Sequence, residues 1–121
     1  MADDPLQSLR LAFKRAFTAY YLEVRSPGIA DPTRAFTTCH AYLSALLDRL
    51  GPGEFMQRLD DETTGLAGSV AQDLRRPKRG APGVVGFAES DFDELEERLR
   101  ECFEYARGRL EDEGRLELIG P

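Results

Sequence analysis

The histidine at position 40 is where chemistry would be expected first, because it is the only histidine in the 121-residue chain. An imidazole that acts as a general base needs a nucleophile or a carboxylate within hydrogen-bond reach. Cys39 precedes His40 directly, but adjacent side chains on a helix point about 100° apart, so these two cannot form a nucleophile–base pair. We therefore expect a non-enzymatic protein, and we assign no catalytic residue to it.

Arg34 and His40 are separated by five residues. This Arg-x5-His spacing resembles the motif of the HEPN-domain ribonucleases, a family of small all-helical proteins. The resemblance implies that the arginine and the histidine act together on an RNA phosphate, usually at a dimer interface. RNA cleavage by Arg34 and His40 is therefore the enzymatic alternative.

Metal and cofactor chemistry has little support in the residue types. One histidine and two distant cysteines, Cys39 and Cys102, cannot supply the four ligands of a structural zinc site. Both cysteines occupy positions on apolar helical faces, which predicts buried free thiols. Gly80, Gly83 and Gly86 follow no strand and precede no Lys-Ser/Thr pair, so they form no phosphate-binding fingerprint. We expect no metal and no cofactor.

A cluster of cations opens the segment between the third and fourth predicted helices, at Arg75, Arg76, Lys78 and Arg79. The first two suit the negative end of a helix dipole, whereas Lys78 and Arg79 lie too far along for that purpose. The cluster therefore predicts a contact with phosphate, with an acidic protein surface or with the acidic helix of a second copy. Any contact with nucleic acid is expected through these residues alone, because the chain carries a net charge of −6.

The fourth predicted helix carries a ridge of like charge at three- and four-residue steps, formed by Glu94, Glu97, Glu101 and Glu104. These steps place the four side chains on one helical face. Partial pairing with nearby arginines on a solvated face is the simpler interpretation. The sharper interpretation is a docking surface for a basic partner.

The elements that would position these residues are helices, because apolar residues recur at three- and four-residue steps in four stretches. Asp4-Pro5 and Asp31-Pro32 are typical helix starts, and Gly51-Pro52-Gly53 is a typical stop. Helices are predicted at about 5–25, 32–50, 54–75 and 91–113.

Two other segments complete the predicted chain. A long Gly/Pro-rich loop is expected at 76–89, and a short tail at 115–121. The third helix is expected to break or kink near 60–65, because Thr63, Thr64 and Gly65 are poor helix formers. The fold class is therefore all-α, an up-down bundle of about four helices that forms one domain over 1–121.

The chain contains no run of about 20 apolar residues that would span a bilayer, and its first residues are acidic rather than basic. These features predict a cytoplasmic protein without membrane contact. We expect a protein–protein interaction module, which is either a small regulatory or adaptor protein or the small subunit of a larger assembly. Its partner would be another protein or another copy of itself. A nucleic-acid accessory protein that uses the 75–79 cluster is the further alternative.

Overall fold

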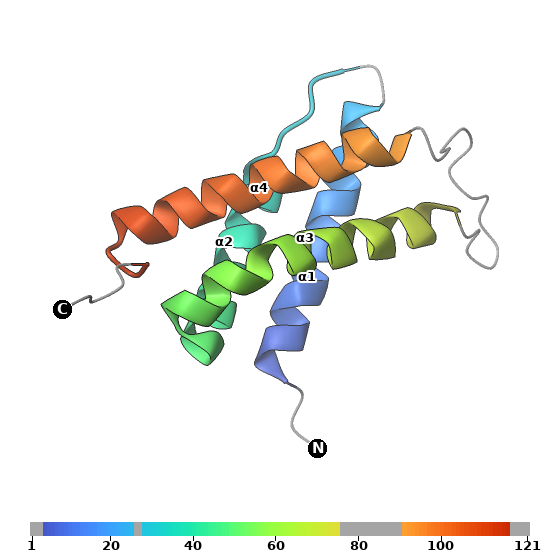
Figure 1. Cartoon of the computed structure of the whole chain (residues 1–121). Coiled ribbons are helices and arrows are strands. Elements are labelled where there is room, and N and C mark those ends of the chain that lie inside the picture. The colour runs from blue at the N-terminus through green and yellow to red at the C-terminus, as the bar shows by residue number, and fades with distance from the viewer. Residues whose placement is uncertain (1–3, 26–27, 76–90, 117–121) are drawn as a thin grey trace.

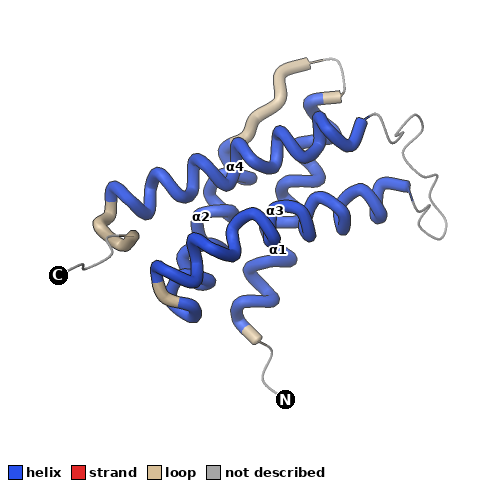
Figure 2. Tube along the Cα trace, viewed as in Figure 1, coloured by secondary structure: helices blue, strands red, loops and turns tan. Residues whose placement is uncertain are grey.

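The computed structural model describes residues 4–25, 28–75 and 91–116, and these residues form four α-helices. The helices are α1 (Pro5–Val24), α2 (Thr33–Leu50), α3 (Pro52–Arg75) and α4 (Phe92–Asp112). No strand occurs in this part of the chain (Figure 2). The prediction of an all-α bundle is confirmed. Of the described helices, none is long and apolar enough to cross a membrane.

The helices form two antiparallel pairs that cross one another (Figure 1). α1 and α2 make one pair, and α3 and α4 make the other. α2 packs closely against both α1 and α4, and α4 also packs against α3. The apolar faces of all four helices meet in one core, so the polar faces of α1, α3 and α4 are turned outward.

The starts of α1 and α2 follow local signals in the sequence, whereas Asp91 at the start of α4 makes no side-chain capping bond. The Asp4 carboxylate accepts a hydrogen bond from the Leu6 backbone N–H at 3.0 Å, and Asp31 does the same for Thr33 at 3.0 Å. These bonds satisfy backbone donors that lack a partner in the first helical turn. The pKa of Asp4 is lowered chiefly by the hydrogen bond from Arg49 and then by the Leu6 bond, and the pKa of Asp31 is lowered by its hydrogen bonds with Thr33. The loop expected at 76–89 lies outside the described residues.

The break expected near 60–65 is wrong, because α3 runs without interruption from Pro52 to Arg75. Thr63 is buried, and its hydroxyl donates to the Leu59 carbonyl within the helix at 2.8 Å. Leu66 and Val70 follow on the same buried face. Each buried apolar side chain contributes about 1.5–3 kcal/mol. This gain outweighs the roughly 1 kcal/mol that Gly65 costs in a helix.

Aromatic rings fill much of the core. Phe13 lies at its centre, with its ring centroid 6.1 Å from Phe17 and 6.0 Å from Phe103. Tyr42 stacks on Phe13 from α2, with its centroid at 6.4 Å. Tyr105 is different: it is 41% exposed and stacks on Phe36 with the centroids 4.6 Å apart. Only this tyrosine of the four is available at the surface.

Both cysteines are buried free thiols, as predicted. Burial raises the pKa of Cys39 well above its ordinary value and raises that of Cys102 to about 12. Because the thiolate is the reactive form, neither residue is suited to nucleophilic chemistry at neutral pH.

Candidate functional site

The outer face of α4 carries the predicted acidic ridge, which consists of Glu94, Glu97, Glu101 and Glu104. All four side chains are exposed. Glu101 forms an ion pair with Arg98, at 3.5 Å between the nearest nitrogen and oxygen atoms. Among the described residues, the other three have no hydrogen-bonding or ion-pair partner. The structure thus brings the four together on one solvated face and leaves most of their charge unneutralised.

Two other carboxylates on the same helix are paired, whereas Asp93 and Asp112 have no ion-pair partner among the described residues. Glu96 contacts Arg100 at 3.1 Å, and Glu111 contacts Arg107 at 2.7 Å. Arg100 also reaches Asp60 on α3 at 3.4 Å. These pairs lie on the flank of α4 that faces α3, where cations from one helix can reach acids from both. Three of the four ridge carboxylates thus lack a partner among the described residues, and so do Asp93 and Asp112 near the two ends of the helix.

Tyr105 lies beside the ridge and adds an aromatic surface to it. It is four residues after Glu101, one helical turn further along the same side of α4. Its stacked partner Phe36 comes from α2 and is half-buried. Aromatic residues, tyrosine among them, are enriched at protein interfaces relative to the rest of the surface.

The basic half of the predicted site is not described. Arg75 is the last residue of α3, and its side chain lies outside the described part of the structure. Arg76, Lys78 and Arg79 also lie outside it. Their proximity to the acidic ridge therefore stays a prediction.

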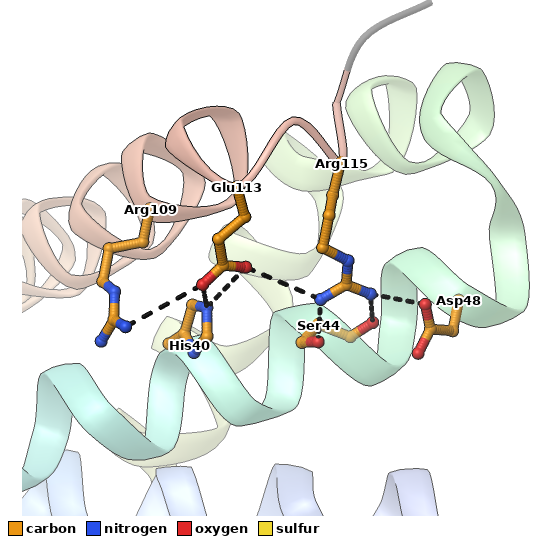
Figure 3. A network of polar contacts seen from close by, with 6 residues as sticks. All are labelled: His40, Ser44, Asp48, Arg109, Glu113 and Arg115. Atoms are coloured by element: carbon orange, nitrogen blue, oxygen red, sulfur yellow. Dashed lines mark hydrogen bonds and ion pairs between the residues drawn. The ribbon is translucent and has the colours of Figure 1, made fainter.

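His40 belongs to a polar network that joins α2 to the end of α4 (Figure 3). Its Nε2 atom lies 3.1 Å from Oε2 of Glu113, the residue that caps the C-terminus of α4. Arg109 and Arg115 each approach the same carboxylate at 3.9 Å. The histidine therefore has a carboxylate and two guanidinium groups around it, and among the described residues no hydroxyl or thiol is hydrogen-bonded to it.

Arg115 completes this network from beyond the helix. Gly114 has a positive φ of 75°, which turns the chain back toward α2. The Arg115 guanidinium then donates to the Ser44 hydroxyl, to the Ser44 carbonyl at 3.3 Å and to Asp48 at 2.5 Å. These bonds hold the segment after α4 against α2, two elements that are distant in the sequence, so we interpret the network as structural.

Sequence reasoning missed this network, although one signal was present. His40, Ser44 and Asp48 follow one another at four-residue steps, so they form a polar row on α2. The sequence does not show which cations would reach that row. The answer depends on the turn at Gly114.

Arg34 and His40 face different helices. Arg34 is exposed and lines a hollow together with α1 residues, whereas His40 contacts Glu113 at the end of α4. One copy of the chain therefore does not bring the two side chains together. RNA cleavage by a site shared between two copies stays a prediction.

No group of three or more potential ligands in the described residues is arranged to hold a metal ion. Comparisons with protein-family models, with curated proteins and with solved structures found no match to this chain.

Proposed function

We propose that this protein is a non-enzymatic interaction module that binds a basic segment of another protein through the outer face of α4. The observation that carries the proposal is the difference between the carboxylates of one helix. Glu96 and Glu111 have arginine partners on the flank of α4, whereas Glu94, Glu97 and Glu104 have none among the described residues.

A ridge of this kind costs the isolated protein a little stability. Like charges three or four residues apart on a helix repel one another by about 0.2–0.5 kcal/mol per pair. A basic partner would remove this repulsion and gain charge-assisted hydrogen bonds. Tyr105, exposed beside Glu101, would supply the apolar anchor that charge alone does not provide.

The cation cluster at 75–79 is the second proposed contact, through Arg75, Arg76, Lys78 and Arg79. Replacing the four with serine should weaken partner binding and leave helicity unchanged. Circular dichroism checks the helicity, and unaltered binding would remove the cluster from the proposal.

The ridge is tested by a fourfold variant, E94Q/E97Q/E101Q/E104Q, that removes its charge and keeps its shape. The tagged wild type and the variant are each used to capture partners from the lysate of the source cell at low and moderate salt. A protein that binds the wild type stoichiometrically at moderate salt, and binds the variant at least about tenfold more weakly, supports the proposal.

The matched control is E54Q/D60N/D61N/D73N, which removes four exposed carboxylates from α3 and changes the net charge by the same amount. Equal loss of the partner in both variants would mean that net charge, and not the ridge, determines binding. Recovery of RNA alone, with release at moderate salt, would also contradict the proposal and would favour the accessory function of the 75–79 cluster.

A further inference from the structure

A hollow of about 310 Å³ lies between α1 and α2. Its α1 side is formed by three alanines and one arginine, and its α2 side by one arginine and one threonine. These residues are Ala12, Arg15, Ala16, Ala19, Arg34 and Thr38. The alanine methyl groups leave an apolar floor, because larger side chains at these positions would fill it. The two guanidinium groups come from opposite sides.

The two arginines differ from every other arginine whose side chain is described. The nine others each have a carboxylate within ion-pairing distance. Arg15 and Arg34 have none among the described residues. The chain has 22 acidic and 16 basic side chains. Among the cations whose side chains are described, the two without an ion-pair partner line the same hollow.

A second cleft in the molecule shows the opposite arrangement. It has a volume of about 220 Å³ and lies between α1, α2 and α3, with Leu6, Leu46 and Leu50 in its lining. Its arginines are neutralised by the protein itself: Arg49 pairs with Asp4 at 2.8 Å, and Arg58 pairs with Glu54 at 3.3 Å. A third hollow, between α3 and α4, is lined by Arg100 and Arg107, which pair with Glu96 and Glu111. Of these three recesses among the described residues, the one between α1 and α2 alone holds arginines without an ion-pair partner.

We propose that the hollow between α1 and α2 binds a small organic anion that has an apolar body and a carboxylate or similar headgroup. The headgroup lies between Arg15 and Arg34, whose planar guanidinium groups match the geometry of a carboxylate. The apolar body covers the alanine floor and removes it from water. This assignment also gives Arg34 a role that needs no contact with His40. The site belongs to α1 and α2, so it is independent of the proposed ridge on α4.

The experiment uses naphthalene-2-carboxylate as a rigid anionic probe and naphthalene-2-carboxamide as its neutral counterpart. Binding is followed in the full chain by the NMR signals of the Ala12, Ala16 and Ala19 methyl groups. We expect saturable shifts of these three signals with the carboxylate, and at least about tenfold weaker binding of the carboxamide.

Three variants separate charge from shape. R15Q/R34Q should bind the carboxylate no better than the carboxamide. Ala19→Leu should abolish binding of both probes, because the larger side chain fills the floor. The position is exposed and leucine is a good helix former, so the fold should be kept. R49Q/R58Q, which removes two arginines from the second cleft, is the matched control and should leave the affinity unchanged.

Several outcomes would overturn the proposal. One is the absence of saturable shifts in the wild type at about millimolar probe, the weakest affinity of interest. Another is full binding by R15Q/R34Q, or equal losses in R15Q/R34Q and R49Q/R58Q. Binding of sulfate as tightly as the carboxylate would show a simple anion patch, with no part for the alanine floor.

Discussion

The outer ridge of α4 and the C-terminal end of the same helix use the same residue types in opposite ways. At the end, Glu113 lies among His40, Arg109 and Arg115, and its charge is neutralised. On the ridge, Glu97 and Glu104 face solvent, without a partner among the described residues. Both regions are solvated, so the difference does not come from burial.

The difference comes from what lies opposite each region. The end of α4 lies against α2, which presents the polar row of His40, Ser44 and Asp48 (Figure 3). On the ridge, Glu104 borders a hollow with Asp60 and Thr63 of α3, but no cation of another helix pairs with it among the described residues. Pairing at the end of α4 therefore depends on the groups that α2 brings within reach. The α3 flank obeys the same rule, since Arg100 links Glu96 to Asp60.

The inner and outer faces of α4 should differ most in their effect on folding. Leu99→Ala removes a fully buried side chain and should lower the free energy of unfolding by about 2–5 kcal/mol. The ridge variant E94Q/E97Q/E101Q/E104Q should change it by less than about 1 kcal/mol, and upward, because repulsion is relieved. Urea unfolding measures both. A large loss in the ridge variant would mean that the ridge has a structural role.

The Arg115 network at the end of α4 should make a moderate contribution to the free energy of unfolding. Arg115→Gln removes the bonds to Ser44, Asp48 and Glu113 together and should cost about 1–2 kcal/mol in unfolding free energy.

Arg109→Gln is the matched control, because that side chain is more exposed and reaches Glu113 only at 3.9 Å. Its cost should stay below about 0.5 kcal/mol. Equal losses of unfolding free energy in the two variants would show that the specific bonds of Arg115 add nothing to stability and that only the positive charge near Glu113 contributes.

The buried face of α4 should make the stability of the protein depend on pH at alkaline pH, through Cys102. Burial raises the pKa of Cys102 from 9.0 to about 12, and the charge of Glu101 adds to the effect. Because the thiol ionises more readily in the unfolded chain than in the folded one, a rising pH favours unfolding. The stability that the protonated Cys102 contributes is therefore complete below pH 9 and is lost as the pH rises toward 12. Above pH 9, the loss should be about 1 kcal/mol per pH unit.

The measurement compares the wild type with Cys102→Ala between pH 8 and pH 10, about where tyrosines begin to ionise. The alanine variant lacks the thiol and should be less stable at pH 8 because of the cavity. The gap between the two proteins should narrow as the pH rises. A gap that stays constant would contradict the raised pKa.

Much of the fold could be predicted from the sequence, because local signals determine it. The caps at Asp4 and Asp31 start their helices where expected, and Gly51 follows the end of α2. The break predicted in α3 does not occur, because packing outweighs helix propensity there. The sequence marks Thr63 and Gly65 as poor helix formers, yet Leu66 and Val70 keep helical phase after them, and their burial outweighs that poor propensity.

The candidate sites could be predicted only in part. The ridge was recognisable, since helical spacing alone brings Glu94, Glu97 and Glu101 onto one face. The sequence did not show which carboxylates would lack partners, because pairing depends on the neighbouring helix. The sequence could not show that Arg15 and Arg34 line one hollow, for the same reason. They lie on different helices, and only the packing of α1 on α2 brings them to it.

Two single substitutions on α4 should show the smallest effects and the clearest contrast. Glu97→Lys places a cation between the acidic neighbours Glu94 and Glu101, so it should raise the free energy of unfolding by about 0.2–0.5 kcal/mol. Glu96→Lys removes the pair with Arg100 and sets two cations one turn apart. It should lower the free energy of unfolding by a similar amount.

Both substitutions change the net charge by the same amount, so any effect of total charge cancels between them. Chemical denaturation at low and high salt measures the difference, which should shrink as salt screens the pairs. A partner bound by the ridge should then reverse the order, because Glu97→Lys stabilises the free protein and weakens the complex. If the two variants shifted stability in the same direction, the contrast between the ridge and the flank would be lost.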